Sequence, residues 1–284
     1  MFDFSLLRPQ PQYPKYPGNY VNTDEYLEQY FYNYYLTHHK NERLKRYYLP
    51  IWWTNLFVDN NPIDVQKYIN AIDWSLPWFT VCQMDDGVRY QLPPNTLVFH
   101  AGGNTGSGMK IPIPLVASPF PEHYKTKKDK DVLASFVGSM THPIRAKLFD
   151  TFISNTDFIF NAPKPWSQSV SDDDLDDFVN ITKRSHFTLS PAGYGFSSFR
   201  TYQAIELGSI PVYISDRQFW LPFRDELNWG EFCVLLHINE IQDLPDILNG
   251  ISEEKRKEML AKGQEVWNSH FSLDKICQNI IKRL

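Results

Sequence analysis

The sequence predicts an α/β fold made of two units, each with parallel strands alternating with helices. Short apolar runs end in polar, glycine-containing loops, as at residues 79–83 and 96–100. Fully apolar strands of this kind are typical of parallel sheets that helices cover on both faces. The pattern stops at a charged stretch, residues 125–131, and then starts again. Two such units place a ligand cleft between them, at the carboxyl ends of the strands.

Length and composition agree with this fold and exclude several classes of protein. The 284 residues are enough for two domains, and 42% hydrophobic with 21% charged residues is ordinary for globular proteins. A net charge of −5 argues against a dedicated nucleic-acid-binding protein. Three widely spaced cysteines indicate neither a disulfide framework nor a structural zinc site. Because no apolar run suits a membrane helix or a secretory signal, we expect a cytoplasmic protein without a membrane span.

The first unit is expected to span residues 1–128. Residues 1–20 are rich in proline, tyrosine and glutamine and predict irregular structure, and residues 24–48 predict a helix. Three strands are expected, at residues 48–53, 79–83 and 96–100.

The second unit is expected to span residues 129–284, with terminal helices that can pack back on the first unit. Its expected strands are residues 132–137, 157–160, 187–189, 210–214 and 235–238. One helix is expected after Ser139, running through Arg145 and Leu148. Further helices are expected at residues 172–183, at 197–207 and over most of 253–284.

The helix predicted at residues 197–207 carries its charges at the unfavourable ends. Ser197 suits the N-cap and Gly208 the position after the C-cap. Arg200 falls in the first turn and Glu206 near the last, where each costs about 0.3–1 kcal/mol against the helix dipole. An anion held between Arg200 and the free N–H groups would reverse the first penalty, and Glu206, about 9 Å further along the axis, could accept bonds from hydroxyls. The alternative is that Arg200 pairs with a structural carboxylate and Glu206 faces water.

The segment around this helix resembles the exostosin family of glycosyltransferases, family 47. Residues 190–212 read SPAGYGFSSFRTYQAIELGSIPV, which is similar to the family pattern of proline, glycine, serine, arginine and Ala-Ile before Ile-Pro-Val. The resemblance extends to residues 214–216 and 221–229, and to the earlier segments 110–114, 135–139 and 142–145. It covers roughly residues 75–250 and is specific mainly in the second half.

The resemblance implies a GT-B fold, with two Rossmann-like domains facing a central cleft, and an inverting transfer of sugar from a UDP-sugar to a glycan acceptor, without a metal or other cofactor. Arg200 matches the family's arginine and would bind the diphosphate. The family often has glutamate directly before the alanine; here that residue is Gln203, so the ribose contact is either Gln203 or Glu206. The remaining donor-site candidates are Gly138, Ser139, Arg145, Trp166 (stacking on uracil), Ser197 and Ser198. The compact form is similar to exostosin-like enzymes of large algal viruses, which favours a pentose donor such as UDP-xylose.

The catalytic base is expected from the first unit, across the cleft. Asp85 and Asp86 follow a predicted strand at its carboxyl end, Asp73 lies beside Trp74, and His100 ends the next strand. The family's usual motif is not matched here, and we expect one of the three aspartates to be the base.

Two other functions are open. The run at residues 172–174 contains the DxD pattern of metal-dependent GT-A enzymes, although it follows Ser171 and opens a helical pattern, where acidic residues favour the N-terminus. A non-catalytic carbohydrate-binding protein on the same fold is the second alternative, supported by Gln203 and by the unmatched base motif.

Overall fold

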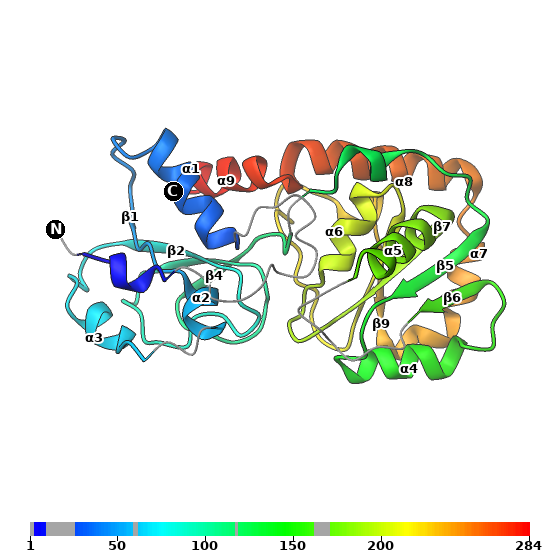
Figure 1. The fold of residues 1–284 in the computed structure, drawn as a ribbon, viewed down its shortest axis with the longest axis horizontal. Helices are drawn as coiled ribbons and strands as arrows, with labels where there is room; N and C mark the ends of the chain where they lie inside the picture. Colours follow the sequence, from blue (N-terminus) through cyan, green and yellow to red (C-terminus); the bar gives the residue numbers. More distant parts are fainter. Residues whose placement is uncertain (1–2, 10–25, 59–61, 117–118, 162–170) are drawn as a thin grey trace.

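The computed structural model describes residues 3–9, 26–58, 62–116, 119–161 and 171–284. Within them, two parallel sheets lie side by side, one in each half of the molecule (Figure 1). The prediction of an α/β fold with two parallel units of strands is therefore confirmed.

The first sheet has its strands in the order β1-β2-β3-β4, all parallel. Their bounds are β1 Tyr47–Tyr48, β2 Trp78–Cys82, β3 Leu97–His100 and β4 Met109–Pro112. The helices of this half are α1 Leu27–His38, α2 Trp53–Val58 and α3 Val65–Asn70.

The second sheet has the order β6-β5-β7-β8-β9, again all parallel. Its strands are β5 Val132–Val137, β6 Phe158–Asn161, β7 Ser185–Pro191, β8 Ile210–Ser215 and β9 Val234–His237. The helices that follow these strands or close the chain are α4 Pro143–Phe152, α5 Asp172–Arg184, α6 Phe199–Glu206, α7 Leu244–Asn249, α8 Glu253–Val266 and α9 Leu273–Lys282. A π-helical turn, Trp267–Phe271, joins the last two.

The main departures from the predicted elements lie in the first half. The strand predicted at residues 48–53 is wrong beyond Tyr48, because Pro50 has no N–H to continue the ladder with β2 and a helix begins at Trp53. The helix predicted at residues 24–48 has its observed bounds at Leu27 and His38. Strand β4 was not predicted, because it lies at the edge of the sheet and its residues are only partly buried.

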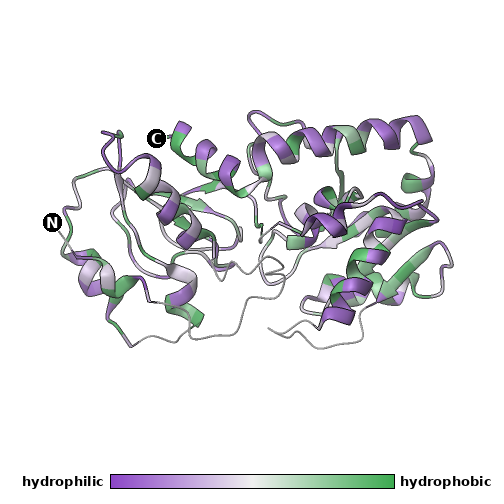
Figure 2. Ribbon diagram, turned by 45° about the horizontal axis from the view of Figure 1, so that its top comes forward, coloured by the Kyte–Doolittle hydropathy of each residue, from purple (hydrophilic) through white to green (hydrophobic). Residues whose placement is uncertain are grey.

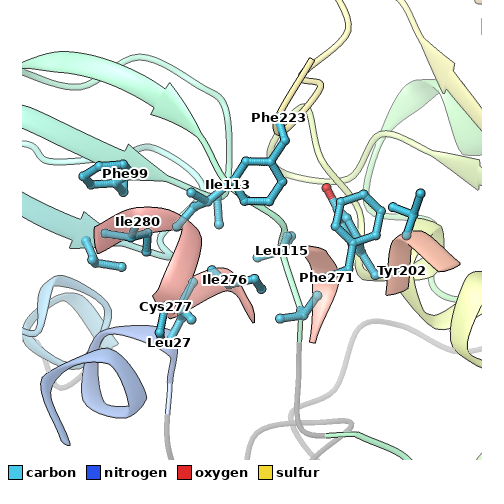
Figure 3. Close-up of a cluster of buried hydrophobic side chains, with 14 of the residues drawn as sticks. Leu27, Phe99, Ile113, Leu115, Tyr202, Phe223, Phe271, Ile276, Cys277 and Ile280 are labelled. Atoms are coloured by element: carbon cyan, nitrogen blue, oxygen red, sulfur yellow. The ribbon is translucent and has the colours of Figure 1, made fainter. Parts of the chain in front are cut away.

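The two sheets share one hydrophobic cluster. It includes Phe79 and Phe99 from the first sheet, Tyr202 and Tyr213 from the second half, and Ile276 from α9. Figure 3 shows these elements converging, with Phe271 beside Tyr202 of α6, Ile280 on the side of Phe99, and Cys277 beside Leu27 of α1. The side-chain packing between the two sheets is therefore continuous.

Helices α8 and α9 run across both halves along one side of the molecule (Figure 1). Helix α8 packs on α6 and β8 in the second half, and α9 packs on α1 in the first. Figure 2 shows α8 largely hydrophilic, whereas the strands of the second sheet are largely hydrophobic. The boundary predicted at residues 128/129 falls between β4 and β5; as a domain boundary it stays a prediction.

No helix in the described part of the chain combines the length and the apolar composition needed to cross a membrane.

Candidate active site

The strand order of the second sheet reverses at one place, and the region beyond the carboxyl ends of the strands there is called the crevice. From β5 the chain moves outward to β6, then returns to the other side of β5 as β7. Ligands of doubly wound α/β folds bind where the strand order reverses in this way, outside the carboxyl ends of the strands. Gly138 and Ser139 follow β5 at this point, and the loop at residues 192–198 follows β7.

The loop after β7 leads into helix α6, whose N-terminus faces the crevice. Ser198 is the N-cap, and its Oγ accepts a hydrogen bond of 3.4 Å from the Arg200 N–H. The prediction of Ser197 as N-cap is therefore wrong by one residue. The Ser197 N–H instead donates to the Gly102 carbonyl in the first half, at 3.2 Å. Gly208 has a φ of +75° after the helix, as its predicted role requires.

Arg200 is held against the end of β5. Its Nε donates to the Val137 carbonyl at 2.6 Å, and its guanidinium lies 4.2 Å from the centre of the Phe178 ring. Its Nη1 also donates to the Gln203 side-chain oxygen, one turn along α6. A Cβ added at Gly138 would lie 3.6 Å from the Arg200 guanidinium.

Arg145, on α4, lies on the other side of the crevice. Its Nη1 donates to the Ser139 carbonyl at 2.7 Å and its Nε to the Ala192 carbonyl at 3.1 Å. Burial, together with the nearby charge of Arg200, lowers the pKa of Arg145 to about 10. Two guanidinium groups that repel each other beside a helix N-terminus form a site that favours an anion.

Asp85 reaches the same crevice from the first sheet, directly beyond the carboxyl end of β2. The Gly195 N–H donates to its carboxylate, and a Cβ at Gly195 would lie 2.6 Å from Asp85 Oδ1. Burial, with the charge of Asp86 as the second cause, raises the pKa of Asp85 to about 6, although Arg145 acts in the opposite direction. Asp85 is thus a partly buried carboxylate that titrates near neutral pH.

The other base candidates occupy different environments. Asp86 is paired with Arg89, which holds its pKa below the ordinary value. Asp73 precedes β2, at the amino end of the sheet, and its carboxylate accepts bonds from the Ser75 N–H and hydroxyl at 2.9 and 2.6 Å. The structure therefore does not bring Asp73 together with the crevice.

His100 is a buried neutral side chain. Burial lowers its pKa to about 4, and its Nε2 lies 2.8 Å from the Met84 carbonyl. Because that carbonyl can only accept, Nε2 carries the proton.

Gln203 and Glu206 lie at different distances from the crevice along α6. Gln203 is bonded to Arg200, as described above. Glu206 accepts the Phe120 N–H at 2.8 Å and lies 3.6 Å from Lys125, and burial raises its pKa to about 7. The alternative expectation that Glu206 faces water is therefore wrong, because its side chain is buried against the segment joining the two sheets.

The acidic run at residues 172–174 forms the first turn of α5. Ser171 caps this helix and accepts the Asp174 N–H at 3.2 Å. Within the described ranges, no three His, Cys, Asp or Glu side chains are grouped as a metal would require. Trp166 lies outside the described residues.

Glycines and one asparagine on the wall of the cleft were not singled out from the sequence. A Cβ at Gly102 would lie 2.3 Å from the Asp85 Cα, so only glycine allows these two loops to meet. Asn104 donates its side-chain N–H to the Tyr194 carbonyl of the opposite half at 2.9 Å. The Gly102-Gly103 pair after a predicted strand was the sequence feature that could have indicated this contact. The loop at residues 192–198, against which the pair packs, lies far along the chain and could not be identified from the sequence.

Comparison with known proteins gives the family of the chain. Residues 87–251 match the exostosin GT47 domain. The chain belongs to the exostosin GT47 family. It has the family's two-sheet α/β arrangement, which is that of GT-B glycosyltransferases.

Individual relatives of this exostosin-family chain come from plants and animals. A probable glycosyltransferase of Arabidopsis thaliana is 30% identical over 61% of this chain and 32% of its own length. A second one is 39% identical over 28% of this chain and 17% of its own length. Exostosin-1 of Drosophila melanogaster is 30% identical over 35% of this chain and 13% of its own length. The chain thus spans a third or less of these relatives.

Proposed function

We propose that this exostosin-family glycosyltransferase moves a sugar from a UDP-sugar to a hydroxyl of a glycan acceptor, by one inverting displacement. One observation carries the proposal. The carboxylate of Asp85, beyond the first sheet, accepts the Gly195 N–H of the loop that leads into α6, and it is close enough to Arg145 for the two charges to interact, at the place where the strand order of the second sheet reverses.

The cationic side of the crevice supports binding of the donor diphosphate. Arg145, Arg200 and the positive end of the α6 dipole would stabilise the charge that develops as UDP leaves. Stabilisation of a departing anion by fixed donors is often the largest single contribution to catalysis. We therefore propose that the reaction does not require a metal.

Asp85 is proposed as the base. At neutral pH a carboxyl with a pKa of about 6 is mostly ionised, and it can accept the proton of an acceptor hydroxyl. The acceptor oxygen attacks the anomeric carbon as the bond from this carbon to the diphosphate oxygen breaks. Attack from the face opposite the leaving group inverts the configuration, and the electron pair of the broken bond leaves with UDP.

Gln203 is proposed as the ribose contact. It lies one turn along α6 from the proposed diphosphate site and is bonded to Arg200. Glu206, the other candidate, is engaged with the Phe120 N–H. UDP-xylose remains the predicted donor, and the likeness to algal-virus enzymes also stays a prediction.

Calorimetric titration with UDP in EDTA, and then with Mn²⁺, tests the proposal. We expect binding in EDTA that Arg200→Ala weakens by about 10–100-fold, the equivalent of a charged hydrogen bond. Arg184→Ala is the matched control, because Arg184 pairs with Asp131 at the opposite end of β7 and should leave the affinity unchanged. Hydrolysis of a panel of UDP-sugars then identifies the donor.

Two results would overturn this assignment. Binding that needs Mn²⁺ and ignores Arg200 would favour metal-dependent chemistry at another place, such as the aspartates at residues 172–174. Binding of no nucleotide would favour a carbohydrate-binding protein without transferase activity.

A further inference from the structure

Two adjoining hollows open beside the loop that carries Asp85, at the carboxyl edge of the first sheet. The larger, of about 500 Å³, is lined by Asp86, Val88, Arg89, Thr105, Gly106 and Ser107. The smaller, of about 210 Å³, is lined by Trp53, Leu56, Phe57, Met84, Gly87, Arg89 and Tyr90. Met84 lines the smaller hollow and Asp86 the larger, and these residues precede and follow Asp85 in the chain. Neither contains a residue of the proposed donor site.

The smaller hollow has aromatic walls. The Trp53 and Tyr90 rings lie 6.2 Å apart at an angle of 32°, and the Trp53 N–H is already bonded to Thr80. Phe57 is 48% exposed, which is unusual for so large an apolar side chain. Trp53 is 3% exposed and supports the hollow from behind, so the accessible ring surface is that of Phe57 and Tyr90. Apolar ring surface of this kind matches the C–H faces of sugar rings.

The larger hollow has polar walls. Thr105, Ser107 and Asp86 offer hydroxyl and carboxylate groups that can exchange hydrogen bonds with sugar hydroxyls. Gly106, one of its lining residues, has a φ of +101°, and a Cβ there would lie 2.9 Å from the Val88 backbone nitrogen, so other residues are excluded.

Arg89 separates the two hollows and is balanced by its neighbours. Its guanidinium is paired with Asp86 and lies 4.0 Å from the centre of the Phe57 ring. The charged residues lining the two hollows therefore sum to zero, and an anionic ligand would have to compete with Asp86 for Arg89. The walls fit an uncharged ligand.

We propose that these hollows bind two neighbouring sugar units of an uncharged glycan acceptor. One unit stacks in the aromatic hollow, and the next makes hydrogen bonds in the polar hollow beside Asp85. This inference rests on the proposed function for the role of the glycan as acceptor, but the binding site itself can be tested without nucleotide.

The test is binding of the nucleotide-free protein to a glycan array that holds neutral gluco-, xylo-, manno- and galacto-oligosaccharides and acidic oligogalacturonides. Titration with the best tetrasaccharide follows. We expect neutral glycans to bind, and Phe57→Ala and Arg89→Ala each to weaken binding by about tenfold. Tyr47→Ala is the matched control, because Tyr47 is 55% exposed at the amino edge of the same sheet. It should change the affinity by less than about twofold.

Binding of no glycan, preference for the acidic ones, or binding that both substitutions leave intact would overturn the proposal. UDP affinity is measured on the same variants and should not change. If UDP fails to bind while neutral glycans bind here, the transferase assignment fails and the glycan site stands. If UDP binds and glycans do not, the glycan site fails and the transferase assignment stands.

Discussion

At the scale of single residues, the environment separates two neighbouring aspartates. Asp86 is paired with Arg89, whereas Asp85 is turned toward Gly195 and partly buried. The sequence placed both beyond the carboxyl end of a strand, as observed, but it did not distinguish their environments. The difference depends on Gly195, which lies 110 residues further along the chain and packs against Asp85.

The proposed role of Asp85 predicts a pH profile. We expect kcat/KM to fall below a pH of about 6, because protonated Asp85 cannot accept the hydroxyl proton. Asp85→Asn should lower kcat by about 10²–10⁴-fold while UDP affinity is retained. Asp86→Asn should move the acid limb to lower pH, since the charge of Asp86 raises the pKa of Asp85. An acid limb that persists in Asp85→Asn would assign the base to another group.

At the scale of the element, α6 shows how far pattern alone reaches. Its arginine in the first turn and its terminal glycine follow from local sequence, and its cap is a serine one residue later than predicted. The position of Glu206 does not, because its partner is the Phe120 N–H, which belongs to the segment between the sheets. The periodic pattern of a helix predicts on which face of the helix a residue lies. It does not predict which distant segment of the chain covers that face.

Glu206 predicts a pH-dependent stability. Its folded pKa of about 7 lies above the ordinary 4.5, so its contribution is complete below pH 4.5 and is lost as pH rises through 7. As pH rises from 4.5 to 7, the free energy of unfolding of Glu206→Gln should therefore increase relative to that of wild type, by up to about 3 kcal/mol. Urea unfolding at pH 5 and pH 8 measures this. Glu122→Gln is the control, because the Glu122 side chain is 88% exposed and pairs with the same lysine. Equal differences at both pH values would contradict the prediction.

At the scale of the whole molecule, the shared cluster joins the two sheets into one packed body. Phe271, in the π-helical turn, contacts Tyr202 with ring centres 5.2 Å apart and also packs on Phe223 and Phe232. The sequence predicted residues 253–284 as mostly helix, with packing back on the first unit as one expectation. The π-helical turn between the sheets could not be predicted, because its wider winding depends on which rings it meets across the interface.

The shared cluster predicts that both halves unfold together. Phe271→Ala should cost about 3–5 kcal/mol and lower a single thermal transition. Leu148→Ala, in the cluster of the second sheet alone, should lower the same transition. Differential scanning calorimetry checks this, because the calorimetric enthalpy of unfolding should equal the van't Hoff enthalpy if the halves unfold together. Two transitions, of which Leu148→Ala shifts only one, would show that the halves unfold independently.

The packing of the first helix on the last has a consequence for synthesis. Tyr30 on α1 donates a 2.8 Å hydrogen bond to Asp274 on α9, across 244 residues of sequence. Proteins made on ribosomes usually fold their N-terminal part first, while the rest is still being added. Here α1 lacks this partner until α9 has left the ribosome. Until then, the apolar face of α1 that contacts α9 is available to chaperones.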